Sequence, residues 1–452
     1  MKRGLVVVLL AGLLPAAGRA QEAPPGGLTL PAAVERALAK FPSVAAARSQ
    51  QRQAQEGLAA EEGARGPRGV LNGWATRYQK PTVVGPIHGF TPGQLPAFDR
   101  TVLQGQFSTN YVIWDGGATS ARIASAGSQL HGAEAALGAA EQDLAERVAS
   151  AYLTALGKAR TLAAHDQRLA ALEAELVRAR RLLDAGKAPQ VEVIRAEANL
   201  AAARSQRVSL AAALDNAERD LARLLDAPVE ETRASRLAPE RLRDPAAPDR
   251  EALARAAIER SPAVAQARAQ LALAEANVNL AASALRPELR AVANLNDWAS
   301  SKGNADTEWN AGLQVTVPLF DGGTVHRRIA QAQAGRAAAA EQVRLAEAQA
   351  REAIDRAAAA AEEAEGRIES LARAADRYAE VARVQKLLLD NGAGTQTDYL
   401  AAEADLLTAR ASLAEGEQAV VLTRVDLARA AGLLNLDWLS ANLEPRSLET
   451  GR

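Results

Sequence analysis

Four windows of the chain alternate apolar and polar residues with a period of two. Trp309 to Phe320, Val102 to Trp114 and Leu289 to Trp298 follow this pattern clearly, and Val70 to Tyr78 follows it more weakly. Strict alternation gives a strand one apolar and one polar face. Segments of roughly 10 residues with aromatic ends are typical of membrane β-barrel strands, and a half-buried soluble sheet is the alternative. We expect barrel strands at about 68–80, 101–114, 288–299 and 308–320.

Outside these windows, alanine-rich sequence predicts helices. The expected helices cover about Leu30 to Arg65, 118–183 and 191–225, and then Arg250 to Leu285, 324–389 and 397–433. At 1.5 Å per residue the longest reach ~100 Å, so they must lie against other helices along most of their length. Apolar residues seven positions apart predict a coiled-coil seam, although an ordinary helical core would give similar stripes. These residues are Leu162, Leu169, Leu176 and Leu183, and Tyr399, Leu406, Leu413, Val420 and Leu427.

The chain is internally duplicated. The segment LLDAGKAPQVEVIRAEANLAAAR matches LLDNGAGTQTDYLAAEADLLTAR 206 residues later, and Pro42 and Pro67 match Pro262 and Pro287 at a distance of 220. Each half therefore has the same order of helix, two strands, long helix and final helix. We divide the chain into repeat 1 (28–225), a proline-rich connector (226–249), repeat 2 (250–434) and a tail of uncertain structure (435–452).

Residues 1–20 have the features of a secretory signal peptide. Lys2 and Arg3 precede an apolar core from Leu5 to Leu14, and Gly18-Arg19-Ala20 is a small-x-small cleavage site. Beyond this segment no apolar run reaches the 18 residues that would suggest a transmembrane helix. We therefore expect an exported protein that no membrane-spanning helix anchors.

Composition excludes several classes of function. Lys+Arg 53 nearly balances Asp+Glu 54, which argues against a nucleic-acid-binding protein. The chain has no Cys, four scattered His and only the initiator Met. A thiolate metal site or a soft-metal relay of Cys, Met and His is therefore absent from this subunit. No Ser, His and Asp set has supporting spacing, so we expect no catalytic site and no cofactor.

Four strands per chain determine how the chain can cross a membrane. An open sheet edge in lipid leaves backbone groups unpaired at a cost of several kcal/mol each, and the smallest closed barrels use about eight strands. Several copies must therefore share one barrel, with their polar strand faces around a wet bore and their helices assembled below it. The segment from Lys80 to Arg100 is rich in Pro and Gly and is expected to be an irregular surface loop.

The chain resembles the outer membrane efflux protein family, the TolC-like exit ducts of Gram-negative bacteria. The resemblance extends from about Leu28 to Leu434 and is carried by LTLPAAVERALAKFPSVAAAR, the repeated Asp-Gly-Gly, VTVPLFDGG and NGAGTQTDYLAAEADL. It implies a mixed fold in which a homotrimer builds a 12-stranded barrel in outer-membrane lipid and a 12-helix tunnel in the periplasm. It also implies a periplasmic adaptor (membrane fusion) protein and an inner-membrane transporter as partners, with drugs, metals, small molecules or polypeptides as cargo.

In each repeat, one turn joins the long helix to the helix that follows it. Glycine is common where a helix ends in the left-handed conformation, which explains the glycine in each turn. The resemblance implies that these hairpin tips also form the periplasmic end, where the adaptor docks. The docking candidates are Leu183, Asp184, Gly186, Leu389, Asp390 and Gly392.

Glu192 and Asp398 follow these turns at equivalent positions. A carboxylate in the first helical turn stabilises the helix N-terminus by ~0.3–1 kcal/mol, which is reason enough for its presence. Around a narrow pore, symmetric copies would instead form an acidic ring that selects cations and holds a gate. The resemblance favours Asp398 as a periplasmic gate residue and Glu192 less. Relatives with a doubled acidic ring have a carboxylate where this chain has Ala401, and Gly394 provides no basic partner.

The two Asp-Gly-Gly triplets are expected to be strand-to-helix turns. Glycine accommodates positive φ and the Asp side chain caps the next helix. A phosphate loop would need a following Lys-Ser/Thr, which both triplets lack. The residues are Asp115, Gly116, Gly117, Asp321, Gly322 and Gly323.

The sequence therefore favours a passive outer-membrane exit duct of a tripartite efflux or type I secretion system. The alternative is a periplasmic coiled-coil scaffold or adaptor with a small β domain. The alternating windows are too short to supply the domain that an adaptor needs between its helices.

Overall fold

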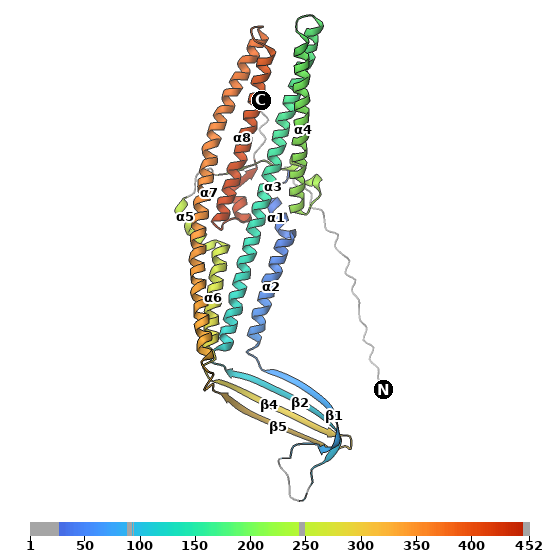
Figure 1. The fold of residues 1–452 in the computed structure, drawn as a ribbon, viewed down its shortest axis with the longest axis vertical. Coiled ribbons are helices and arrows are strands. Elements are labelled where there is room, and N and C mark those ends of the chain that lie inside the picture. Colours follow the sequence, from blue (N-terminus) through green and yellow to red (C-terminus); the bar gives the residue numbers. More distant parts are fainter. Residues whose placement is uncertain (1–26, 88–92, 94, 244–248, 446–452) are drawn as a thin grey trace, which may run out of the picture.

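The computed structural model describes residues 27–87, 93, 95–243 and 249–445. The expected signal peptide at 1–20 lies outside these residues. Long helices form an elongated body with a β-sheet at one end and two helical hairpins at the other (Figure 1). Among the described residues, no helix combines the length and apolar character needed to span a membrane.

Four antiparallel strands form the sheet. They are β1 (Arg68–Val83), β2 (Phe98–Trp114), β4 (Glu288–Ser300) and β5 (Ala305–Thr316), in the order β1-β2-β4-β5. The central pair, β2 and β4, joins the two sequence repeats. Each repeat thus contributes one hairpin, and β1 and β5 are the edge strands of the sheet.

The register separates the sheet into two chemically different faces. Residues that are directly opposite one another across paired strands lie on the same face. Most positions on one face are apolar and most on the other are polar, as the alternation predicts, although Trp74, Trp298 and Val292 lie on the polar face. The apolar face carries Leu71, Leu103, Phe107, Tyr111, Ala291, Leu295, Trp309 and Leu313, and the polar face carries Asn72, Gln104, Gln106, Ser108, Asn294, Asn296, Asn310 and Gln314. Asp297 is an exception on the apolar face, where its carboxylate accepts a 2.7 Å hydrogen bond from the Thr307 hydroxyl.

The edge strands differ from the expected ranges at their ends. β5 was expected to continue to Phe320 but ends at Thr316. In the other repeat, Tyr111 to Trp114 extend β2 because β4 pairs with them, whereas the equivalent end of β5 has no such neighbour within the chain. β1 continues to Val83 through a register shift between Arg77 and Thr82.

This longer β1 corrects the expected loop from Lys80 to Arg100. Pro81 belongs to the strand, and β2 already begins at Phe98. Proline cannot donate a ladder hydrogen bond, so an irregular stretch of an edge strand is a position that tolerates it. Residues 88–92 and 94 of the intervening loop lie outside the described residues.

The first helix expected in each repeat is two helices. Leu30 to Arg65 contains α1 (Leu30–Lys40) and α2 (Pro42–Gly63), and Arg250 to Leu285 contains α5 (Arg250–Arg260) and α6 (Pro262–Ser283). The residues before Pro42 and Pro262 have extended backbones with ψ of 132° and 126°. A proline ring disfavours helical conformation in the preceding residue, so each helix is interrupted there.

The remaining long helices form two hairpins. α3 (Ala118–Asp184) turns into α4 (Gln190–Leu225), and α7 (Thr324–Asp390) turns into α8 (Gln396–Ala430). Leu169 on α3 packs with Leu200 and Ala203 on α4, and Ala382 on α7 packs with Leu406 on α8. Side chains of the predicted seven-residue stripes therefore fill the seams of both hairpins.

Short elements, here called the belt, lie near the middle of the helical body (Figure 1). The belt contains the 3-10 turns η1 (Val229–Glu231) and η2 (Ala234–Arg236), β3 (Glu240–Leu242), α9 (Leu436–Asn442) and β6 (Leu443–Pro445). β3 pairs with β6, so the described part of the C-terminal tail is ordered against the connector. Residues 244–248 and 446–452 lie outside the description.

The largest core cluster lies beneath this belt. Tyr152 of α3 is fully buried there, and its hydroxyl lies 2.6 Å from the Leu28 carbonyl and 2.5 Å from the Ala238 carbonyl. Glu240 accepts a 2.9 Å hydrogen bond from the Leu30 amide. The hydrogen bonds of Tyr152 and Glu240 thus link the start of α1, the middle of α3 and the connector.

Candidate functional site at the hairpin tips

Both Asp-Gly-Gly triplets connect a strand to a long helix. The Asp115 carboxylate accepts hydrogen bonds from the Gly117 amide (3.2 Å) and the Thr119 amide (2.7 Å). Asp321 accepts in the same way from Gly323 (2.9 Å) and Val325 (2.6 Å). All four glycines have positive φ between 66° and 95°. These bonds fix the direction in which each helix leaves the sheet.

The hydrogen bonds also stabilise the charged form of each carboxylate. Burial opposes the ionisation of Asp115, but its bonds to Thr119 and Gly117 outweigh this effect and lower its pKa. The pKa of Asp321 is lowered mainly by the hydrogen bonds from the Val325 and Gly323 amides. The chemistry of the triplets is helix capping. Among the described residues, no group of three or more His, Cys, Asp or Glu is arranged to hold a metal ion.

The two hairpin tips have matching backbone geometry. Gly186 and Gly392 have φ of 70° and 72°, the left-handed conformation in which glycine avoids the strain of a side chain. The Gly186 amide donates to the Leu183 carbonyl (2.8 Å), and the Gly392 amide donates to the Leu389 carbonyl (3.0 Å). Both turns therefore close at the far end of the helical body from the sheet (Figure 1).

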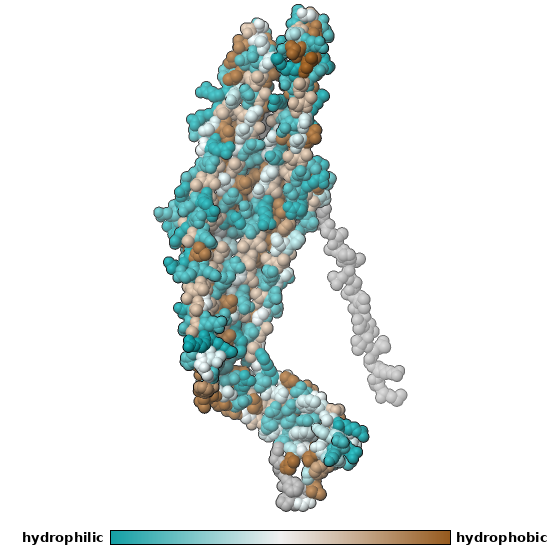
Figure 2. All heavy atoms as spheres, viewed as in Figure 1, coloured by the Kyte–Doolittle hydropathy of each residue, from teal (hydrophilic) through white to brown (hydrophobic). Residues whose placement is uncertain are grey.

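The docking candidates present a mixed surface at these tips. Asp184, Gly186, Asp390 and Gly392 are exposed, and Leu183 and Leu389 are half-buried. Figure 2 shows hydrophobic side chains among hydrophilic ones near the ends of the hairpins. Each tip thus offers carboxylates and apolar contact area to a partner.

The equivalent carboxylates Glu192 and Asp398 have different surroundings. Each is the third residue of its helix, α4 or α8. Asp398 is exposed, its amide donates to the Thr395 hydroxyl oxygen (3.1 Å), and its carboxylate accepts from that hydroxyl (2.6 Å). Glu192 is half-buried and forms a 3.3 Å ion pair with Arg195.

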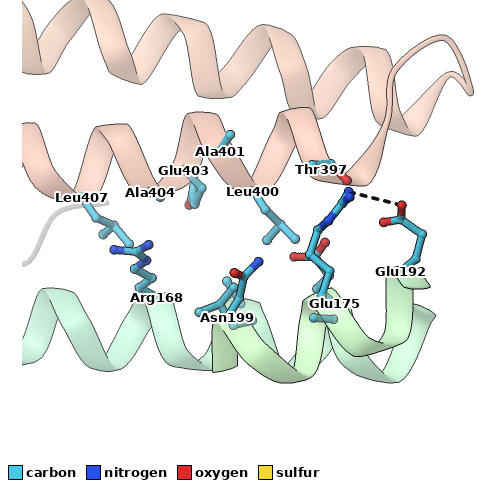
Figure 3. A pocket seen from close by; sticks show the side chains of 14 residues that line it. Arg168, Glu175, Glu192, Asn199, Thr397, Leu400, Ala401, Glu403, Ala404 and Leu407 are labelled. Atoms are coloured by element: carbon cyan, nitrogen blue, oxygen red, sulfur yellow. Dashed lines mark hydrogen bonds and ion pairs between the residues drawn. The ribbon is translucent and has the colours of Figure 1, made fainter. Parts of the chain in front are cut away.

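Glu192 lines a groove of about 190 Å³ between the two hairpins of the chain (Figure 3). Side chains of α3 and α4 approach those of α8 across it, with Leu400 between the two sides. Asp398 does not line this groove. The lining includes Arg168, Leu172, Glu175, Glu192, Arg195 and Asn199 from α3 and α4, and Thr397, Leu400, Glu403 and Leu407 from α8.

Two like charges meet in this groove. Burial raises the pKa of Glu175, the nearby Glu192 carboxylate raises it further, and Arg178 partly opposes both effects. Arg178 also donates a 2.6 Å hydrogen bond to Gln396 at the start of α8. Polar and charged contacts therefore hold the two hairpins of one chain together near their tips.

Sequence reasoning missed these groove residues. Glu175 and Arg178 lie within a long charged helix, where most such pairs are solvated, and nothing in a single sequence shows that α8 covers them. The Thr395 cap could have been found, because Thr followed three residues later by an acid resembles a capping box.

Comparison with known proteins gives a consistent result. The family model described as "Outer membrane efflux protein" matches residues 33–227 and 253–433. "Outer membrane efflux protein BepC" of Brucella suis is 24% identical over 371 residues, covering 80% of this chain and 78% of BepC. "Proteases secretion protein PrtF" of Dickeya chrysanthemi is 28% identical over 309 residues, covering 65% of each chain.

A solved structure has the same fold. The outer membrane protein VceC from Vibrio cholerae superimposes with a TM-score of 0.71 at 19% identity, covering 89% of this chain and 96% of VceC. The arrangement of sheet, helical body and hairpin tips is therefore common to both proteins.

Proposed function

We propose that this chain, which belongs to the outer membrane efflux protein family, assembles with two further copies into a passive exit duct. The chain is an outer-membrane protein whose helical part extends into the periplasm. Its proposed role is to conduct substrates that an inner-membrane transporter and a periplasmic adaptor deliver. One relative is named for efflux and another for protease secretion, so the proposal is the duct common to both names.

The observation that carries this proposal is the two-faced sheet with two unpaired edges. Its apolar rows suit lipid, and its rows of Asn, Gln and Ser suit a water-filled bore. The edge strands β1 and β5 must find partners because unpaired backbone groups are costly in lipid. A periplasmic scaffold is not expected to contain such a sheet, because its apolar face would be exposed to water.

At the other end, the hairpin tips are the proposed docking surface for the adaptor. Asp398 is the proposed gate carboxylate, since its exposed position leaves it available to a pore. Glu192 is a weaker candidate for that role because Arg195 already pairs with it.

Conductance in planar lipid bilayers tests the proposed duct. The purified protein should produce discrete conductance steps, because each closed assembly opens one aqueous path. Purified protein that associates with the bilayer without producing any conductance steps would contradict the duct. The scaffold alternative predicts that cell fractionation finds the protein in the soluble periplasmic fraction.

A further inference from the structure

Two tryptophans lie together on the polar face of the sheet. Trp74 of β1 is directly opposite Gln104 of β2. Gln104 is also opposite Trp298 of β4, and Trp298 is opposite Asp306 of β5. We call these four residues the tryptophan row. Tryptophan is enriched where a membrane protein meets the boundary of lipid and water, and Trp309 on the apolar face fits this use. Lipid contact does not account for the two indoles of the tryptophan row, because they lie on the opposite face.

The polar face is the more enclosed face of the sheet. On the polar face, Val102 and Asn296 are only 8% and 9% exposed. Leu103 and Leu295, which are adjacent to them in sequence and lie on the apolar face, are 47% and 45% exposed. This difference is expected if the polar face is the concave side of a barrel wall. The tryptophan row then faces the bore of the proposed duct, and the inference rests on the proposed function for this reason.

The tryptophan row lies near the end of the sheet that is away from the helices. Trp298 is two residues before the end of β4 at Ser300, and Asp306 is the second residue of β5. The chain that follows β1 also reaches the row. A Cβ atom at Gly85 would lie 2.6 Å from an Asp306 carboxylate oxygen, so this glycine lies directly against the Asp306 side chain. Because the helices extend into the periplasm, this end of the bore is its exit.

The groups of the tryptophan row are open to the bore. Among the described residues, no ring contact involves either indole, and the Asp306 carboxylate forms no hydrogen bond or ion pair. Trp74 is 45% exposed, and Asp306 is exposed as well. Two indoles and one carboxylate are therefore accessible to a molecule that passes along the polar face.

The charges around the row favour a cation. Glu308 lies on the polar face in the adjacent row, on the same strand as Asp306. The basic residues Arg68 and Arg290 belong to rows near the helices, and Arg100 lies beyond the row on the side of the loops. Among the paired positions of the polar face, the two carboxylates are thus the charges nearest to the indoles.

We propose that the tryptophan row is a weak binding site for planar aromatic cations at the exit end of the bore. An indole stacks on aromatic rings and attracts a cation to its face. Trp74 and Trp298 are two strand spacings apart, roughly 9–10 Å between Cα atoms, and paired ring centroids lie about 4.5–7 Å apart. One planar ring system therefore fits between the indoles, with Gln104 below it to accept from an amino group and Asp306 beside it to balance its charge.

Weak binding is what an exit path requires. A conducting site must bind a molecule well enough for it to enter and weakly enough for it to leave. The tryptophan row is open to water on one side, so its contacts are only partly desolvated. The site is complete within one chain, and each copy in the proposed duct contributes one such site to the bore.

Proflavine, a planar aromatic cation, is the probe for this site. Added to the purified protein in planar lipid bilayers, it should reduce the current through open channels reversibly and in proportion to its occupancy. Trp74→Leu and Trp298→Leu should each raise the half-blocking concentration by about 3- to 30-fold, the range expected for one lost cation–π contact. Trp309→Leu is the matched control on the opposite face of the sheet and should leave this concentration unchanged.

Two further probes separate the aromatic ring from the charge. Tetraethylammonium has the charge without the ring, and naphthalene-2-sulfonate has the ring with the opposite charge. Each should need a concentration at least about 10-fold higher than proflavine to reduce the current equally. Asp306→Asn should weaken the block by proflavine but not the block by naphthalene-2-sulfonate. Equal block by all three probes would overturn the site.

Discrete conductance steps that proflavine does not reduce would overturn the site and leave the proposed duct intact. An effect of Trp309→Leu as large as that of Trp74→Leu would do the same. Folded protein that gives no steps would overturn the proposed function and, with it, the place of the row in a bore. Fluorescence anisotropy of proflavine with the detergent-extracted protein measures binding separately, and a Kd that the double variant Trp74→Leu with Trp298→Leu leaves unchanged would overturn the site in either case.

Discussion

Asp398 and Glu192 are chemically similar residues at equivalent positions. Glu192 forms an ion pair with Arg195, whereas the Asp398 carboxylate forms no ion pair with the described residues and accepts a hydrogen bond from Thr395. In a threefold assembly, three Asp398 carboxylates would face a common axis if the proposed gate is correct. Asp398→Asn should then reduce the preference of the channel for cations, because it removes negative charge from the narrowest part.

Reversal potentials in a KCl gradient measure this preference. Glu192→Gln is the matched control at the equivalent helix position and should change the reversal potential less, because Arg195 already balances that charge. Equal shifts for both variants, or no shift for Asp398→Asn, would remove Asp398 from the gate.

Glu240 gives the belt a predictable response to pH. Burial raises the pKa of its carboxyl, and the hydrogen bond from the Leu30 amide only partly offsets this effect. Because the pKa in the folded protein is above that in the unfolded chain, the group favours folding most at low pH. This contribution is lost as the pH rises through the folded-state pKa.

Glu240→Gln should therefore unfold at a higher temperature than the unchanged protein at pH 7, while the two proteins converge near pH 4. The amide oxygen of glutamine can still accept from the Leu30 amide. Thermal unfolding followed by circular dichroism between pH 4 and 8 measures the difference. A variant that loses stability equally at every pH would show that the carboxylate charge is not the destabilising factor.

Tyr152 tests how much the belt contributes to stability. Its hydroxyl is within hydrogen-bonding distance of the Leu28 and Ala238 carbonyls in a buried site. Tyr152→Phe should lower the free energy of unfolding by about 1–3 kcal/mol, because a buried acceptor is left without its donor.

Chemical denaturation of the purified protein measures this loss. Tyr399→Phe is the matched control, since the Tyr399 hydroxyl has no hydrogen-bond partner within the described part of the chain. A loss for Tyr399→Phe as large as that for Tyr152→Phe would show that the hydrogen bonds of the Tyr152 hydroxyl do not stabilise the belt.

At the level of elements, the hairpin tips depend on two glycines. Beyond Gly392 and its two chain neighbours, no heavy atom of the described residues lies within 4 Å of the position that a Gly392 Cβ would occupy, so Gly392→Ala tests backbone conformation alone. A left-handed alanine costs roughly 1–2 kcal/mol. Hydrogen exchange of amides 387–394 should accelerate by about 5- to 30-fold as this turn opens more often.

Gly57→Ala in α2 is the control, because it also adds a methyl group in open space but has helical backbone. It should slow exchange locally, since alanine favours a helix interior by about 0.5–1 kcal/mol over glycine. Unchanged exchange at the tip of Gly392→Ala would show that the left-handed conformation is not needed there.

The elements that the sequence predicted well are those with long, regular patterns. Two-residue alternation identified the strands and their faces, and the duplication identified equivalent helices and turns. The helix breaks before Pro42 and Pro262 were missed because the apolar pattern continues through them, although each proline restricts the residue before it. The pairing of β3 with β6 was missed because three-residue strands have too few residues to show a period.

The candidate site was only partly accessible to sequence reasoning. Glycine spacing located both tips, and equivalence of the repeats paired Glu192 with Asp398. Their different surroundings depend on Arg195, Glu175 and the approach of α8, which are features of tertiary packing. A single sequence records which residues are present but not which long helix covers which face.

At the scale of the whole molecule, the sheet at one end of the elongated body and the hairpin tips at the other have different requirements. The sheet needs further strands because β1 and β5 are open edges, and the hairpins need neighbours because apolar residues remain exposed on α4 and α7. A closed ring of three copies satisfies both requirements with one repeated interface. Heterologous contacts of this kind form a ring when the rotation closes and a filament when it does not.

The mass of the assembly tests the central claim most directly. Native mass spectrometry of the protein extracted in detergent from outer membranes should find one species of three copies, since four strands from each copy complete one barrel. A folded single copy that remains stable after extraction, or an open series of oligomers without a closed trimer, would contradict the account.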